Sequence, residues 1–156
     1  MAKRIDPNSL TAAKAQYLRR LAEIASDIYE PGQGAGLKPD IAPSWSRLEK
    51  DELRSLGVRP RDIRDASETI FGSNTDFKAG IYKTEKGDIV VAFAGTEGAK
   101  DWYHNLKQGA GFESGQYNQA AALARKVAIA GNDVSFTGHS LGGGLATLAS
   151  AITDKP

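Results

Sequence analysis

The sequence predicts a mixed α/β fold in which a mostly parallel sheet is flanked by helices. Three observations lead to this prediction. Residues 89–94 form a short apolar run, as expected for a strand covered on both faces. Residues 133–137 form a second strand-like run that leads through a glycine-rich turn into the helix-like residues 141–152. Amphipathic stretches at 9–29 and 115–130 supply flanking helices.

The N-terminal part of the chain is predicted to be helical. A stripe of apolar residues at helical spacing favours a helix over residues 9–29 that packs on the core. The members of the stripe are Tyr17, Leu21, Ile24 and Ile28. Asn8 or Ser9 is the expected cap. A membrane-surface helix is disfavoured because the polar face carries both charge signs. Residues 45–56 predict a short helix that stops at Gly57.

The second half of the chain alternates strands and helices. Residues 77–84 and 89–94 predict two strands, and the four turn residues between them indicate a hairpin. The remaining elements are expected at 101–108 and 115–130 (helices), 133–137 (strand) and 141–152 (helix).

Composition and charge exclude several classes of function. Hydrophobic residues make up 40% and charged residues 25% of the 156 residues, which rules out extended disorder. A formal net charge of +1 gives no electrostatic footprint for nucleic acid. Without cysteine there is no thiolate site or cysteine nucleophile, and two histidines disfavour a histidine-built metal site. Neither a metal nor a cofactor is expected.

The first residues do not resemble a targeting signal. The start is basic at Lys3 and Arg4, but no continuous apolar stretch follows, and the next predicted helix is rich in charge. This pattern excludes a signal-peptide core or a membrane span in that segment. The expected location is therefore the cytoplasm, or an exterior reached by a signal-independent bacterial secretion route.

The most informative segment is residues 138–142, Gly-His-Ser-Leu-Gly, which fits the G-x-S-x-G pattern of a nucleophile elbow. Its position between a predicted strand and a predicted helix would strain the backbone of Ser140 and lift its hydroxyl above the sheet. A side chain at Gly138 or Gly142 would collide with the neighbouring strand or helix. The helix N-terminus would direct its free N–H groups at a developing oxyanion. A glycine-rich turn that serves only packing is the alternative.

A second oxyanion donor is expected from the turn after residues 89–94. Gly95 permits a tight turn there, and Thr96 offers a backbone N–H and a hydroxyl. A simple glycine turn is the alternative.

Three ordered motifs resemble the class 3 (fungal-type) lipase group of the α/β-hydrolase superfamily, over roughly residues 77–153. The motifs are Val91–Thr96, Asp101-Trp102 with Asn105-Leu106, and Gly138–Gly143. The resemblance implies a serine lipase or phospholipase that acts on lipid carboxyl esters through an acyl-enzyme at Ser140. It also implies that Thr96 and the Leu141 N–H hold the oxyanion and that His139 stands beside the elbow.

The residues after Ser140 supply no general base. The 16 residues that follow contain no histidine and one acid, Asp154, which would lie about 20 Å away at the far end of a helix. His139 should diverge from Ser140 in a sharp turn, and no feature of the sequence supports His104 as the base. The last helix also lacks the strand that would complete a right-handed βαβ unit. We therefore expect an incomplete α/β-hydrolase fold, truncated just after the nucleophile helix, with the triad Asp and His beyond residue 156 and this chain alone inactive.

The expected domain organisation and partners follow. Residues 1–76 form an N-terminal helical segment of the domain, and residues 77–156 form the first part of the hydrolase core. The partner is a lipid or phospholipid ester, with membrane-surface contact through that substrate. One alternative is an inactive binding or assembly module that self-associates through its incomplete sheet. Another is part of an antibacterial lipase toxin with an immunity or inhibitor protein, because residues 1–76 loosely resemble bacterial antibacterial lipase effectors.

Overall fold

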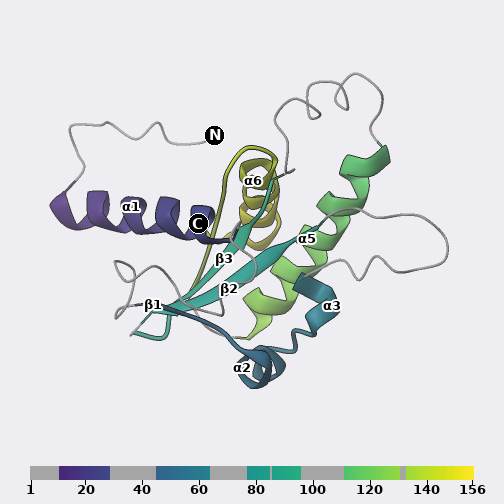
Figure 1. Cartoon of the computed structure of the whole chain (residues 1–156), viewed down its shortest axis with the longest axis horizontal. Helices are drawn as coiled ribbons and strands as arrows, with labels where there is room; N and C mark the ends of the chain where they lie inside the picture. The colour runs from purple at the N-terminus through teal and green to yellow at the C-terminus, as the bar shows by residue number, and fades with distance from the viewer. Residues whose placement is uncertain (1–10, 29–44, 64–76, 85, 96–110, 131–132) are drawn as a thin grey trace.

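The computed structural model describes residues 11–28, 45–63, 77–84, 86–95, 111–130 and 133–156 (Figure 1). Its elements in order are α1 (Ala12–Asp27), β1 (Trp45–Arg47), α2 (Lys50–Ser55), α3 (Pro60–Ile63), β2 (Ala79–Thr84), β3 (Ile89–Phe93), α5 (Gly111–Ile129), β4 (Val134–Gly138) and α6 (Leu141–Thr153). The mixed α/β prediction is confirmed. The helix predicted over 101–108 and the predicted caps Asn8 and Ser9 lie outside the described residues.

Within the described residues, the sheet has four strands in the order β1-β2-β3-β4. β2 pairs antiparallel with both β1 and β3, whereas β3 and β4 run parallel. The prediction of a mostly parallel sheet is therefore wrong for the described strands. The short turn between β2 and β3 allows only antiparallel pairing, while α5 provides the long crossover that the parallel pair β3–β4 needs.

The helix predicted over 45–56 is wrong for its first residues, which form the strand β1. That helix begins only at Lys50, and the three residues Trp45–Arg47 instead pair with Tyr82–Thr84 of β2. A three-residue strand is too short to show a period-two pattern, so pairing with β2 decides its conformation. The predicted end of the helix is confirmed, because Gly57 takes a left-handed φ of 71°.

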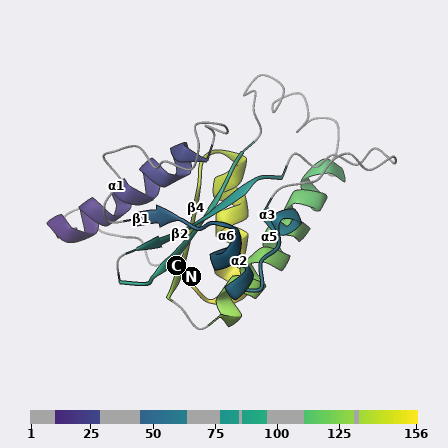
Figure 2. The same ribbon diagram turned by 60° about the horizontal axis from the view of Figure 1, so that its bottom comes forward.

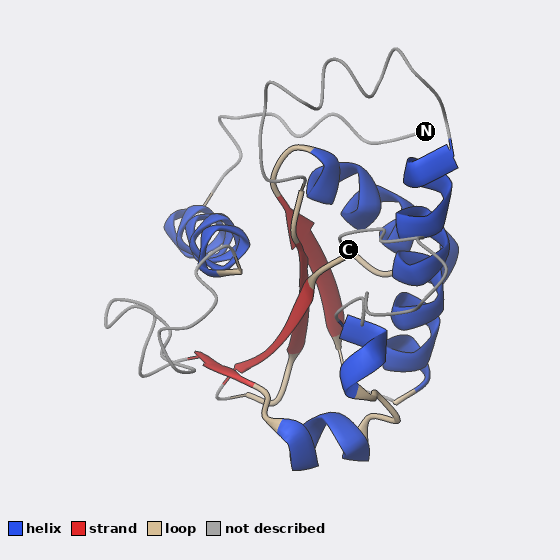
Figure 3. Ribbon diagram, turned by 45° about the vertical axis from the view of Figure 1, so that its right-hand side comes forward, coloured by secondary structure: helices blue, strands red, loops and turns tan. Residues whose placement is uncertain are grey.

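The helices cover both faces of the sheet. α1 lies on one face, and α5 and α6 lie together on the other (Figures 1 and 3). The turned view in Figure 2 also shows the strands between these two layers. Along β3 the side chains of Val90 and Ala92 join the cluster under α1, and those of Ile89, Val91 and Phe93 join the cluster under α5 and α6. The prediction that this strand is covered on both faces is confirmed.

The predicted apolar stripe packs against the sheet only in the second half of α1. Ile24 and Ile28 are buried against the sheet and Leu21 packs beside them, whereas Tyr17 stays partly exposed. The cap is Thr11 and not the predicted Asn8 or Ser9; its hydroxyl accepts a hydrogen bond from the Lys14 N–H at 3.3 Å. In the part of the chain that the structure describes, no helix combines the length and apolar character needed to cross a bilayer.

The chain turns back to the sheet after α6. Asp154 ends the helix in a left-handed conformation with φ 54°, and the Phe136 N–H donates to the Pro156 carbonyl at 2.8 Å. Because this N–H points away from β3, Pro156 lies against the outer edge of β4.

Candidate active site

The segment 138–142 lies where β4 ends and α6 begins. Phe93 and Gly138 are register partners in the parallel pair, so the carboxyl ends of β3 and β4 lie side by side. Ser140 is the residue just before α6, and both it and His139 are exposed. The predicted strand–turn–helix context around Ser140 is therefore present.

The backbone of Ser140 is strained. Its φ of 55° and ψ of −125° lie in a region that side-chain-bearing residues rarely occupy and that costs on the order of 1–3 kcal/mol. Among the described residues other than glycine, only Asp154 shares a positive φ. The Gly143 N–H donates to the Ser140 carbonyl at 3.0 Å and closes the turn. This conformation holds the side chain of Ser140 out of the helix and in solvent.

Close backbone contacts explain the two glycines that flank Ser140. A Cβ at Gly138 would collide with the carbonyl group of Gly142, and a Cβ at Gly142 would collide with the carbonyl oxygen of Phe93. These neighbours are backbone atoms of α6 and β3, so neither can move aside as a side chain could. The predicted steric need for glycine at both positions is confirmed.

The third glycine of α6, Gly144, has its nearest neighbour on another helix. Gly144 does not face the strands: a Cβ there would lie 2.6 Å from the hydroxyl oxygen of Tyr117 on α5. Gly144 therefore allows α5 to lie close to α6. The sequence gives no signal for this contact, because Tyr117 and Gly144 are on different helices.

His139 faces α1. Its Nε2 lies 3.4 Å from the Ser26 hydroxyl oxygen, within hydrogen-bond distance. Ser26 could not be found from the sequence, because a serine within a helix carries no sign of a contact with a residue 113 positions away. The second half of α1 is thus part of the surroundings of the Ser140 turn.

A buried hydrogen bond fixes this part of α1 to the sheet. The Tyr82 hydroxyl on β2 donates to an Asp27 carboxylate oxygen at 2.9 Å, and both side chains are buried. Burial raises the pKa of Tyr82 well above its ordinary value, and the negative charge of Asp27 raises it further. Tyr82 therefore stays protonated as the donor, and Asp27 keeps a partner inside the protein.

The expected oxyanion loop is described only at its start. The Ala94 N–H donates to the Lys78 carbonyl at 3.0 Å, and both Ala94 and Gly95 are buried. Thr96 is the next residue and lies outside the described residues. The motif residues Asp101, Trp102 and Asn105, and the histidine His104, also lie outside the described residues.

The structure places Asp154 at the opposite end of α6 from Ser140. A helix of 13 residues separates the two by about 20 Å, so Asp154 does not reach the serine. Within the described ranges, no three acidic or histidine side chains gather into a group that could hold a metal ion. Leu141, the first residue of α6, carries a helix N-terminal N–H next to Ser140.

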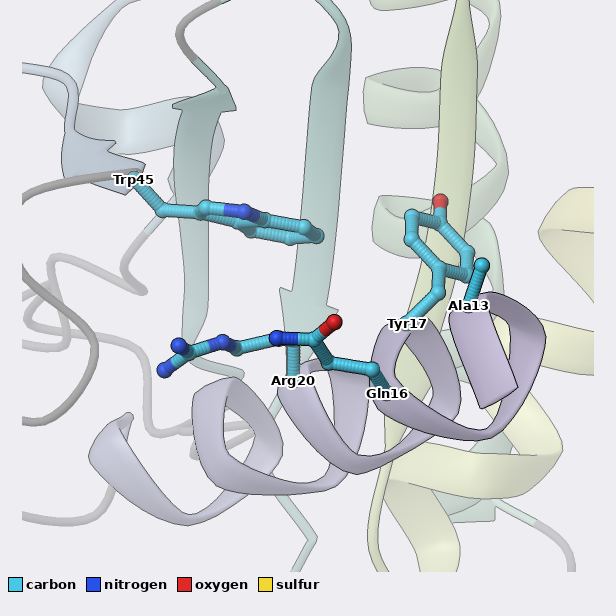
Figure 4. Close-up of a pocket in the computed structure, with 5 residues that line it drawn as sticks. All are labelled: Ala13, Gln16, Tyr17, Arg20 and Trp45. Atoms are coloured by element: carbon cyan, nitrogen blue, oxygen red, sulfur yellow. The ribbon is translucent and has the colours of Figure 1, made fainter.

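A separate pocket lies at the other end of α1. It has a volume of about 230 Å³, and its walls come from α1 and β1 (Figure 4). The lining residues are Ala13, Gln16, Tyr17, Arg20 and Trp45. Because His139 contacts α1 at Ser26, near the helix C-terminus, this pocket is distinct from the surroundings of Ser140.

Comparisons with known proteins give a consistent result. Residues 20–156 match the family model described as phospholipase-like, Tle-like phospholipase domain. The extracellular phospholipase A1 of Serratia liquefaciens is 39% identical over 135 residues, which is 85% of this chain and 38% of that protein. The chain thus spans well under half the length of this curated relative.

Proposed function

This chain belongs to the Tle-like phospholipase domain family, and from that premise we propose that its whole protein hydrolyses carboxyl esters of phospholipids through an acyl-enzyme at Ser140. The family membership confirms the lipase-like resemblance of the sequence motifs. The observation that carries the proposal is the strained, exposed Ser140 between β4 and α6, with φ 55° and glycines at both flanks. This is the geometry that a nucleophile elbow requires.

The proposed reaction has two steps. The Ser140 Oγ attacks the ester carbonyl, its proton passes to a general base, and the lipid alcohol leaves with a proton to give an acyl-enzyme. Water then attacks the acyl-enzyme and releases the fatty acid and the free serine. The Leu141 N–H and Thr96 are the proposed oxyanion donors. The register of β3 and β4 supports this pairing, because Thr96 follows β3 three positions after Phe93, the partner of Gly138.

We infer that the rest of the fold and the triad come from the whole protein. The proposed fold is an α/β-hydrolase of which residues 1–76 and 77–156 form the first parts, with the triad Asp and His beyond residue 156. The greater length of the Serratia relative supports this inference. The position of Asp154, a full helix away from Ser140, also supports it.

The proposed place of action is a phospholipid surface outside the producing cell. The extracellular relative supports export. Substrate then reaches Ser140 at a membrane surface. If the whole protein is an antibacterial lipase toxin, the alternative given above, we predict an immunity or inhibitor protein as its partner.

The variant Ser140→Ala of the full-length protein tests the proposal. We expect fatty-acid release from phosphatidylethanolamine vesicles to fall by at least about 10³-fold, because the nucleophile is lost. A fluorophosphonate probe should label the wild-type protein and not this variant. Ser150→Ala, on the same helix, is the matched control and should keep both activity and labelling.

Two outcomes would contradict the proposal. Retained hydrolysis in Ser140→Ala would exclude Ser140 as the nucleophile. A folded full-length wild-type protein that neither hydrolyses vesicles nor reacts with the probe would favour the inactive binding or assembly module.

A further inference from the structure

A row of polar contacts joins α1 to β4 along the face opposite α5 and α6. Every second residue of β4 and the residue that follows the strand take part, and we call this row the polar seam. Its contacts are Tyr17 with Ser135 (2.9 Å between the two hydroxyl oxygens), Thr137 Oγ1 with the Leu21 carbonyl (3.2 Å), and His139 Nε2 with Ser26 Oγ (3.4 Å). The seam therefore ends at the residue next to Ser140.

A second hydrogen bond of Ser26 indicates which atom donates in its contact with His139. The Ser26 hydroxyl donates its single hydrogen to the Ala22 carbonyl at 3.3 Å, one turn earlier in α1. With that hydrogen directed to Ala22, the Ser26 oxygen accepts, and we infer that the imidazole Nε2 supplies the hydrogen between Ser26 and His139. The contact therefore selects the form of His139 that carries hydrogen on Nε2.

The backbone around Ser26 is held firmly in place. Its neighbours Ala25 and Asp27 are both buried, and Asp27 accepts the hydrogen bond from Tyr82 on β2. Ile24 and Ile28 pack into the cluster between α1 and the sheet. Ser26 itself is exposed but projects from a fixed part of the helix, so it can serve as a fixed point for His139.

We propose that Ser26 is a positioning residue that acts through His139 to keep the Ser140 turn in its reactive conformation. The imidazole of His139 contacts Ser26 on α1, and the backbone of His139 leads directly into the strained backbone of Ser140. Fixing the ring limits the motion of the peptide that leads into Ser140, which positions the nucleophile before substrate arrives. This inference rests on the proposed hydrolase activity at Ser140 and adds a residue 114 positions upstream of it.

A double-mutant cycle in the full-length protein tests the proposal. Ser26→Ala should lower kcat on phospholipid vesicles about fivefold, the equivalent of one hydrogen bond, and leave KM unchanged. The same substitution made on His139→Ala should cause no further loss, because the contact is already absent. Ser26→Thr keeps the hydroxyl and should restore kcat. Tyr17→Phe, which removes the far end of the polar seam, is the matched control and should keep wild-type kcat.

Nitrogen NMR of the His139 side chain gives a readout that is independent of turnover. The wild-type ring should carry its hydrogen on Nε2, and Ser26→Ala should show a mixture of the two neutral forms. Equal losses of kcat from Ser26→Ala in the wild-type and His139→Ala backgrounds would overturn the proposal, as would hydrogen on Nδ1 in the wild type. If Ser140→Ala keeps activity, the proposed function fails instead, which separates the two ideas.

Discussion

Gly142 and Gly144, two glycines of α6 close to Ser140, differ in the kind of atom that a side chain would meet. A methyl group at Gly142 would collide with the Phe93 carbonyl oxygen, which belongs to the backbone of β3. A methyl group at Gly144 would lie 2.6 Å from the hydroxyl oxygen of Tyr117, the end of a side chain. The first collision can be relieved only by separating α6 from the sheet, whereas the second disappears when one oxygen is removed.

We therefore expect Gly142→Ala to lower the free energy of unfolding by about 3 kcal/mol or more, and Gly144→Ala by about 1–2 kcal/mol. Adding Tyr117→Phe should recover most of the loss from Gly144→Ala and none of the loss from Gly142→Ala. Urea denaturation of the two single variants and the two double variants measures these changes in the free energy of unfolding. Gly57→Ala is the control for backbone strain alone, because its φ is 71° and no atom lies within 4 Å of a Cβ there; it should cost about 1 kcal/mol. Failure of Tyr117→Phe to help Gly144→Ala would contradict the predicted contact.

At the level of elements, α3 is joined to α5 through one carboxylate. An Asp62 oxygen lies 2.7 Å from the Lys126 Nζ and also accepts from the Arg59 backbone N–H at 2.8 Å. Burial raises the pKa of Asp62, but the hydrogen bonds from Lys126 and Arg59 lower it more, so the pKa lies below its ordinary value of 3.8. The stability that this carboxylate contributes is therefore present above pH 3.8 and is lost as the pH falls through the lowered pKa.

The variant Asp62→Asn should reveal this pH dependence. We expect it to lower the free energy of unfolding by about 1 kcal/mol at pH 7, and the difference from wild type should shrink as the pH falls below 3.8. Urea unfolding at pH 7 and pH 3 measures the effect. Asp51→Asn is the matched control, because its pair with Arg54 is highly exposed, and it should change stability by under about 0.5 kcal/mol at either pH. A pH-independent loss in Asp62→Asn would contradict the prediction.

For the whole molecule, the central feature is the strand β3, whose side chains contribute to two hydrophobic clusters, one on each face of the sheet. β3 is 0–2% exposed along its whole length, because α1 covers one face and α5 with α6 cover the other. β1, by contrast, has three residues and pairs with β2 alone among the described strands. Opening β3 requires separation of both layers, whereas β1 can detach from the edge by itself.

Amide hydrogen exchange should follow this difference. We expect the slowest exchange at Val90, Val91 and Ala92, and exchange at Ser46 at least about 100-fold faster. Mass spectrometry or NMR of the folded protein measures both. Similar protection at the two strands would show that the molecule opens only as a single unit and would contradict this prediction.

Much of the fold follows from local sequence. The apolar run at 89–94 predicted a strand buried on both faces, and the spacing of Ile24 and Ile28 predicted the face of α1 that packs. The left-handed turn at Gly57 and the need for glycine at 138 and 142 were also predictable, since each depends on the backbone within a few residues or on its adjacent strand. The strand β1 was not predictable, because three residues carry too little pattern to compete with a helix prediction.

The sequence by itself determined which of the longer segments become strands and helices and that Ser140 stands at a strained turn between two of them. Those outcomes depend on periodicity, on glycine and on the steric limits of the backbone, all of which act over short distances along the chain. Only the tertiary structure decided that β1 extends the sheet, that Gly144 faces Tyr117, and that Ser26 reaches His139 from 113 positions away. These contacts join elements distant in sequence, and their partners are set by how the two helical layers pack on the sheet.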